Sequence, residues 1–116
     1  MSVEMNMRMT LRVAAALLLM PLAAQASTIE MKVFGMVCGY CAQGIEKSLR
    51  THDATADVVV SLENKLVAVT TREGQDITDD ELRKMITKAG YDLKSISRTK
   101  RTMSEIRGEV LEAANQ

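Results

Sequence analysis

The chain holds two cysteines, Cys38 and Cys41, with Gly39 and Tyr40 between them. Thiolate sulfur is a soft ligand that favours Cu(I), zinc and similar ions over magnesium or calcium. The same pair could close into a disulfide, but so small a loop removes little chain entropy and contributes little to stability. The spacing therefore indicates chemistry, either metal binding or thiol–disulfide exchange.

The cysteines lie where an alternating apolar segment, residues 29–33, gives way to a helical pattern. Alternation of apolar and charged residues is typical of a half-buried strand. From Cys41 onward the pattern is helical, with Ile45 and Leu49 four residues apart. A helix that begins at Cys41 has its positive end at the thiols, and this lowers their pKa.

The first 26 residues have the order of a secretory signal peptide. Arg8 and Arg12 precede a short apolar run at 13–20, and small residues follow at 23–26. That run is shorter than the roughly 20 residues needed to span a membrane, although an uncleaved anchor is the alternative reading. We predict cleavage after Ala26, export to the periplasm and an oxidising environment for the cysteines.

Charge and composition exclude several classes of function. The chain has 15 basic and 15 acidic residues of mixed order, which argues against nucleic acid as a partner and leaves no polybasic stretch for a membrane surface. It has no Trp, two Tyr and one Phe, too few aromatic rings for a stacking platform. No catalytic triad, carboxylate dyad or phosphate-binding glycine loop is recognisable, so we expect a protein that is not an enzyme.

The remaining elements follow in the order strand, strand, helix, strand. Residues 58–62 and 66–71 form a predicted hairpin whose register the sequence leaves open. Thr78 and Glu81 fit a capping box at the start of a second helix, and Gly90 is a suitable stop. A short strand is predicted at 93–97. The whole order predicts an α+β, ferredoxin-like βαββαβ sandwich, with two helices on one face of a four-stranded antiparallel sheet.

The expected core and domain limits follow from this pattern. We assign residues 27–98 to the domain and 99–116 to a C-terminal extension, in which Thr102 and Glu105 fit a second capping box before a short helix. That helix is expected to pack back on the domain or to fray, and a docking helix for a partner is the alternative. The predicted core comprises Ile29 or Met31, Val33, Ile45, Leu49, Val58, Val60, Val67, Val69, Leu82, Met85, Ile86 and Ile96.

The run from Gly35 to Cys41, with Met36 before the cysteines, resembles the GMxCxxC signature of heavy-metal-associated domains. That family includes bacterial copper chaperones, soluble domains of copper-transporting P-type ATPases and the periplasmic mercury-binding protein. The resemblance covers about residues 28–97, and the segment 89–91 agrees with it. It implies that Met36 packs under the loop and that Tyr91 lies near the metal. Val37 and Tyr40 depart from the usual pattern.

By this resemblance Cys38 and Cys41 are the metal ligands of an exported metallochaperone. The expected cargo is Cu(I) first and Hg(II) second, transferred by ligand exchange with a metal-transporting P-type ATPase or another metalloprotein. Two thiolates suit a low-coordinate ion, whereas zinc sites take three or four protein ligands. The mature form is expected to be a soluble monomer, with a metal-bridged dimer as the alternative. The competing function is a periplasmic thiol–disulfide oxidoreductase that uses the same pair.

His52, the single histidine, is not expected to be a third ligand. If the helix runs from Cys41 to about Arg50, its rise puts His52 roughly 16 Å from the cysteines, whereas a ligand bond is about 2 Å long. We interpret His52 as a surface residue at a helix end. Met31 and Met85 occupy apolar periodic positions and are interpreted as core residues.

Overall fold

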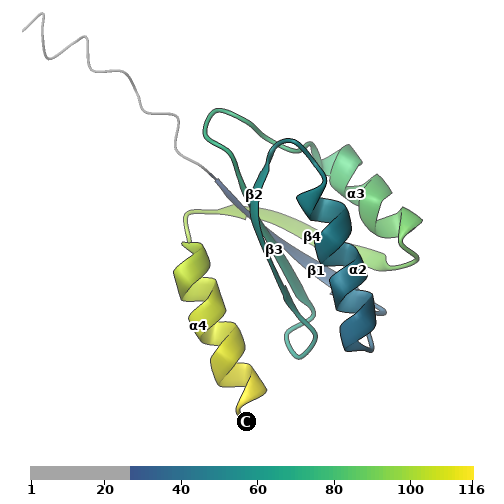
Figure 1. Ribbon diagram of the computed structural model, residues 1–116, viewed down its shortest axis with the longest axis vertical. Helices are drawn as coiled ribbons and strands as arrows, with labels where there is room; N and C mark the ends of the chain where they lie inside the picture. The colour runs from purple at the N-terminus through teal and green to yellow at the C-terminus, as the bar shows by residue number, and fades with distance from the viewer. Residues whose placement is uncertain (1–26) are drawn as a thin grey trace, which may run out of the picture.

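The structure is a computed structural model that describes residues 27–116, so the predicted signal peptide lies outside the described residues. Its elements are β1 (Thr28–Phe34), α2 (Gly39–Arg50), β2 (Thr55–Ser61), β3 (Leu66–Thr71), α3 (Asp79–Lys88), β4 (Asp92–Thr99) and α4 (Met103–Ala114). The predicted ferredoxin-like order is confirmed (Figure 1). Within the described part of the chain, no helix is long and apolar enough to cross a membrane.

The four strands form one antiparallel sheet in the order β2-β3-β1-β4. In the hairpin, Val58 lies opposite Val69 and Val60 opposite Val67, which settles the register. The pairing is irregular between Thr55 and Asp57, at the start of the edge strand β2. The central strand β1 is therefore held on both sides, and it leads directly into the cysteine loop.

Helices cover both faces of the sheet. Figure 1 shows α2 and α3 on one face and α4 on the other. The α2–α3 face holds the main core, because alternate side chains of each strand point toward it. Its buried members are Ile29, Met31, Val33, Met36, Ile45, Leu49, Ala54, Val58, Val67, Val69, Ile77, Leu82, Ile86 and Leu93.

Three residues of the predicted core are only partly buried: Val60, Met85 and Ile96. Val60 and Ile96 lie on the edge strands β2 and β4, where one neighbouring strand is missing. The prediction that these three residues are buried was wrong, although each still packs against the core. Connecting segments supply buried residues that periodicity did not indicate, among them Ala54 and Ile77.

The C-terminal extension packs back on the domain as α4. Ile106 is fully buried with Val59, Leu66 and Ala68 in a second apolar cluster, on the sheet face opposite α2 and α3. The predicted capping box is present, with the Glu105 N–H donating to the Thr102 hydroxyl. Because α4 buries this cluster, the sheet is sandwiched between two helical layers.

Both capping predictions for α3 are confirmed. The Thr78 hydroxyl accepts from the Glu81 N–H, and the Glu81 carboxylate accepts from the Thr78 N–H. Gly90 follows the helix with φ +93°, a conformation that favours glycine. This sharp exit leads the chain past the cysteine loop into β4.

Candidate metal site

The cysteine loop begins with a turn that a side chain would disfavour. Gly35 follows β1 with φ +99°, and a Cβ built there would lie 3.4 Å from Cδ1 of Tyr91. Glycine therefore serves the left-handed turn, while a Cβ there would only be in ordinary van der Waals contact with the Tyr91 ring. The Tyr91 ring thus lies next to Gly35, beside the loop, where the resemblance placed it.

The two cysteines meet at the N-terminal end of α2, but the helix begins earlier than predicted. It starts at Gly39 rather than Cys41, and the extended residue Cys38 is its N-cap. Cys38 Sγ accepts a hydrogen bond from the Cys41 N–H at 3.3 Å. The sulfur thus acts as the N-cap acceptor, a role usually filled by a side-chain oxygen. This cap explains why the helix begins two residues earlier than predicted.

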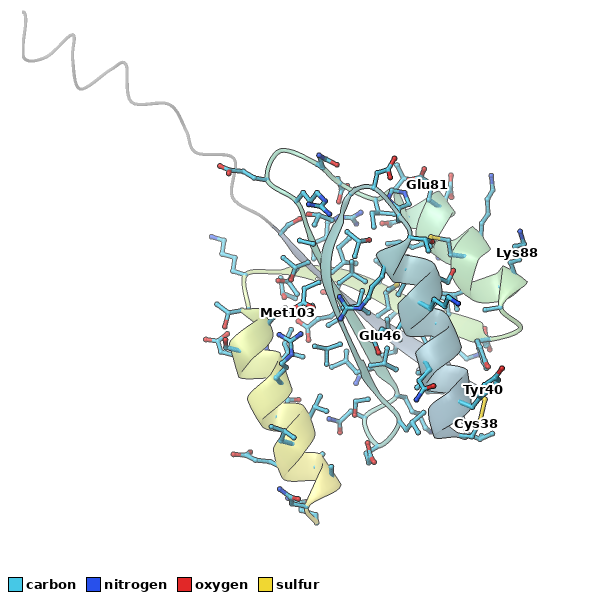
Figure 2. All side chains as sticks on the ribbon, viewed as in Figure 1. Cys38, Tyr40, Glu46, Glu81, Lys88 and Met103 are labelled. Carbon is cyan, nitrogen blue, oxygen red and sulfur yellow. A yellow bond between two sulfur atoms is a disulfide. The ribbon has the colours of Figure 1, made fainter. Side chains whose placement is uncertain are left out.

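The pair is joined as a disulfide, with the two Cα atoms 5.3 Å apart. Cys38 is exposed and Cys41 half-buried, so reagents can reach the bond from solvent. Figure 2 shows the sulfur atoms beside Tyr40 at the end of α2. Because a disulfide sulfur is a poor ligand, metal binding requires reduction of the bond by two electrons and two protons to the dithiol.

Of the three large side chains next to the two cysteines, Met36 is buried, whereas Val37 and Tyr40 project into solvent. Met36 is 7% exposed and belongs to the main core, as the resemblance implied. Val37 and Tyr40 are 87% and 86% exposed. A loop anchored from below by Met36 presents its cysteines, Val37 and Tyr40 to the outside.

His52 lies away from the cysteines, as predicted. It follows the C-terminal end of α2, where its Nδ1 accepts from the Ala54 N–H at 3.1 Å and its Nε2 is 3.8 Å from a Glu81 carboxylate oxygen. Figure 2 shows Glu81 and Cys38 at opposite ends of the helical layer. His52 therefore closes a turn and is no ligand for the cysteine site.

A hollow of about 210 Å³, which we call the tip groove, lies beside the cysteines between α2 and the end of α3. It is lined by Tyr40, Cys41, Gly44, Ile45, Ala89 and Tyr91. Sequence reasoning did not assign this groove. The one local signal that could have indicated it is Gly44, a glycine in the middle of a predicted helix.

The donor set fits a low-coordinate soft cation. Among residues 27–116 there is no group of three or more His, Cys, Asp or Glu side chains that could hold a metal ion. After reduction the cysteines supply two thiolates, enough for an ion that accepts two sulfur ligands and too few for a tetrahedral zinc site. The nearby N-terminal end of α2 favours the negative charge of the thiolates.

Comparisons with known proteins agree with this geometry. A structure described as the CopZ metallochaperone is 28% identical, with 58% of this chain and 98% of that chain covered and a TM-score of 0.54. The N-terminal domain of a potential copper-translocating P-type ATPase from Bacillus subtilis, solved in the Cu(I)-loaded state, is 26% identical, with coverages of 66% and 95% and a TM-score of 0.58.

The Cu(I)-loaded first domain of the human copper chaperone for SOD1 is 28% identical, with coverages of 63% and 99% and a TM-score of 0.52. Among curated proteins, none matches the chain. Residues 30–92, more than half of the chain, match the heavy-metal-associated domain, a span that contains the cysteine loop and its supporting elements. This chain therefore belongs to the heavy-metal-associated domain family.

Proposed function

We propose that the chain is a metallochaperone that carries one Cu(I) ion between the thiolates of Cys38 and Cys41. The observation that carries the proposal is the placement of two adjoining cysteines, one exposed and one half-buried, at the N-terminal end of α2, without a group of three or more possible ligand side chains among the described residues. Solved relatives in Cu(I)-loaded states support copper as the cargo. Hg(II), which also accepts two thiolates, is the second choice.

The proposed transfer is a ligand exchange without net redox change. A thiolate of the acceptor adds to the bound Cu(I), one of the two cysteine thiolates leaves, and a second acceptor thiolate displaces the other. The exposure of Cys38 allows the incoming sulfur to approach. The acceptor in this proposal is a metal-transporting P-type ATPase or another metalloprotein, and the chain catalyses no chemical conversion.

Copper stoichiometry of the reduced protein tests the site. Under anaerobic conditions we expect one Cu(I) per chain, and a Cys38→Ser/Cys41→Ser variant should bind at least about 100-fold more weakly, since alcohol oxygen is a hard, poor ligand for Cu(I). Competition with a chromophoric Cu(I) chelator measures both affinities. If the double variant held copper as tightly as the native chain, the assignment of the ligands would be wrong.

Export is part of the proposal and rests on the signal-like order of residues 1–26. In an oxidising compartment the cysteines need a reductant before they bind copper, and the disulfide in the structure is the form that such a reductant would meet. The intact mass of the protein recovered from the periplasm of an expressing bacterium tests cleavage after Ala26. An uncleaved mass would contradict it.

The disulfide also favours a second candidate function, thiol–disulfide exchange. Cys38 is exposed at a helix N-terminus, a position that activates thiolates in redox enzymes. Insulin reduction by the dithiol form distinguishes the two functions. Catalytic turnover there, together with weak copper binding, would replace the chaperone proposal by an oxidoreductase.

A further inference from the structure

The end of β1 carries an exposed aromatic ring flanked by two lysine side chains. Phe34 is the last residue of the strand and is 39% exposed. The Nζ atom of Lys65 lies 4.5 Å from the centre of its ring, and that of Lys94 lies 5.9 Å from it. At these distances the ring attracts an ammonium group. The surface here therefore joins an apolar ring to positive charge.

The fold assembles a basic patch that no run of residues in the sequence shows. Lys32 lies on β1, Lys65 in the turn between β2 and β3, and Lys94 on β4, and all three are exposed. The turn is held against β1, because the Val33 N–H donates to the Lys65 carbonyl oxygen at 2.9 Å and the Lys32 ammonium donates to that of Asn64 at 3.1 Å. We call the following residues the lysine patch: Phe34, Lys32, Lys65 and Lys94.

Two lysines of the patch have no carboxylate partner. Lys32 and Lys65 form no ion pair among residues 27–116, whereas Lys94 pairs with Asp92 at 2.7 Å. Two carboxylates share a hollow with Lys32, and both are paired with Arg101: Glu30 and Glu109. The patch therefore keeps positive charge that the described part of the chain does not neutralise.

Lys65 has a backbone conformation that disfavours a side chain. Its φ is +52°, the one positive value outside glycine in the described part of the chain. Glycine adopts this conformation without steric cost, whereas a lysine does so with strain. Glu63, in the same turn, accepts from the Ser61 hydroxyl at 3.4 Å and forms no ion pair with Lys65. Strain at a position whose side chain extends over Phe34 points to a role for that side chain beyond folding.

The lysine patch lies at the same end of the molecule as the cysteine loop. Figure 1 shows the turn between β2 and β3 at the end where β1 leads into α2. Val37 and Tyr40 project from this loop, 87% and 86% exposed. Together with Phe34 they are three of the four exposed large apolar side chains among residues 27–116. A cluster of apolar groups on a soluble surface marks a contact surface.

From these features we propose that this end of the molecule docks on the anionic surface of a lipid bilayer. The lysines contact the lipid phosphates, and the projecting apolar side chains enter the headgroup layer, where aromatic rings with a polar neighbour are favoured. Projecting groups suit a deformable lipid surface, into which they can insert. The contact holds the cysteine loop at the membrane; this purpose, although not the contact itself, rests on the proposed function.

Co-sedimentation with lipid vesicles tests the contact. Residues 27–116, the folded part that the structure describes, are used as the metal-free dithiol, so that the apolar run at 13–20 does not itself bind lipid. The probes are vesicles of pure phosphatidylcholine and vesicles of equal parts phosphatidylcholine and phosphatidylglycerol. We expect at least about tenfold tighter binding to the anionic vesicles, and this binding should weaken as salt is raised.

Removing the unpaired charges tests the role of the patch. One lysine near an anionic bilayer contributes about fivefold in affinity, so Lys32→Gln/Lys65→Gln should weaken vesicle binding by at least about tenfold. Lys84→Gln/Lys100→Gln is the matched control with the same change in net charge. Lys84 lies on α3 and Lys100 follows β4 at its far end, and neither forms an ion pair in the described part of the chain. The control should bind as the native chain does.

Lys65→Gly separates docking from folding. Glycine relieves the backbone strain, so resistance to urea should not fall, while the loss of one ammonium group should weaken vesicle binding about fivefold. Tyr40→Ser, at an exposed position, should also weaken vesicle binding without lowering resistance to urea. Native vesicle affinity of the Lys65→Gly variant would show that this lysine serves the turn alone and would overturn the proposal.

Three further results would overturn the proposal. The first is equal affinity for anionic and neutral vesicles. The second is displacement from vesicles by inorganic phosphate at matched ionic strength, which would assign the patch to a free anion. The third is binding of polyglutamate without binding of vesicles, which would assign it to an acidic protein. Because the titration is metal-free, these failures leave copper binding intact, whereas vesicle docking by a chain that binds no Cu(I) would refute only the proposed function.

Discussion

Asp57 is the residue that joins the two helical layers. Its carboxylate lies 2.6 Å from Arg107 of α4 and 3.3 Å from Arg50 of α2, and it accepts the Val58 N–H at 2.9 Å. Burial alone would raise the pKa of Asp57, but the hydrogen bonds from Arg107, Val58 and Arg50 together outweigh it and lower the pKa below its ordinary value. Asp57 lies at the irregular pairing at the start of β2, and from there its carboxylate contacts arginines of helices on both faces of the sheet.

Replacing Asp57 should reduce stability near neutral pH and change its acid dependence. A depressed carboxylate pKa means that the folded chain binds fewer protons than the unfolded chain, so the contribution is present above the unfolded pKa and is lost as pH falls through the folded pKa. We expect Asp57→Asn to lower the free energy of unfolding by about 1 kcal/mol at pH 7, a small value because the ion pairs are partly exposed. The difference from the native chain should shrink below about pH 4.

Urea unfolding between pH 7 and pH 3 measures this effect. Asp53→Asn is the control, because the Asp53 carboxylate forms no ion pair in the described part of the chain. A constant difference between the Asp57 variant and the native chain across this range would show that the carboxylate charge does not carry the effect.

At the scale of elements, α4 is held by one side chain more than by any other. Ile106 is its single fully buried residue, and the second apolar cluster forms around it. Arg101, two residues before the helix, pairs with Glu30 of β1 and Glu109 of α4, and Arg107 of α4 pairs with Asp57. Because these pairs are partly exposed, they orient α4, while Ile106 supplies most of its docking free energy.

Ile106→Ala should therefore destabilise the domain by about 2 kcal/mol, at the low end for a buried Ile, because α4 can undock instead of leaving a cavity. Leu111→Ala, at a position 64% exposed on the same helix, should cost less than about 0.5 kcal/mol. Denaturant unfolding measures both changes, and hydrogen exchange in α4 should rise only in the first variant. Equal effects would place the docking energy elsewhere on the helix.

The sequence predicted the helices better than the faces on which they pack. Capping boxes at Thr78 and Thr102 are local signals, and both helices begin where these signals indicate. The burial of Val59, Leu66 and Ala68 under α4 was not predictable from alternation, because residues 58–60 and 66–69 are continuous apolar runs. Such runs indicate burial without telling which element covers each face.

The candidate site was predictable to the same extent. Cys38 and Cys41 were singled out by their local spacing and Met36 by the family resemblance, whereas the tip groove was not predicted, since it joins Gly44 of α2 to Ala89 and Tyr91 after α3. Contacts between residues so far apart depend on how the helices pack. The early start of α2 was missed for another reason: a cysteine sulfur acts as its N-cap, a role usually taken by oxygen.

At the scale of the whole molecule, the cysteines and α4 are separated by the sheet. The cysteine loop connects β1 to α2, whose buried side chains pack in the main core, while α4 closes the opposite face over a core of its own. Figure 1 shows this three-layer arrangement. Metal binding at the loop should therefore stabilise the folded chain without requiring α4 to move. The redox state of the Cys38–Cys41 disulfide should decide whether the metal binds.

Copper should raise the stability of the dithiol form alone. A ligand that binds only the folded state contributes RT ln(1 + [L]/Kd), about 2.7 kcal/mol at a free concentration of 100 Kd. Unfolded chains also retain a thiol pair that can bind copper, so the measured gain should fall below this value. The disulfide form has no free thiol among residues 27–116, and its stability should not change with added Cu(I).

Thermal unfolding in buffers of fixed free Cu(I), with and without reductant, measures both forms. The Ile106→Ala variant, whose substitution lies on the other side of the sheet, should gain as much from copper as the native chain does. A copper-dependent rise in the midpoint of the disulfide form would place the metal at other side chains. An unchanged midpoint of the dithiol form at saturating copper would mean that the folded chain offers no better site than the unfolded one.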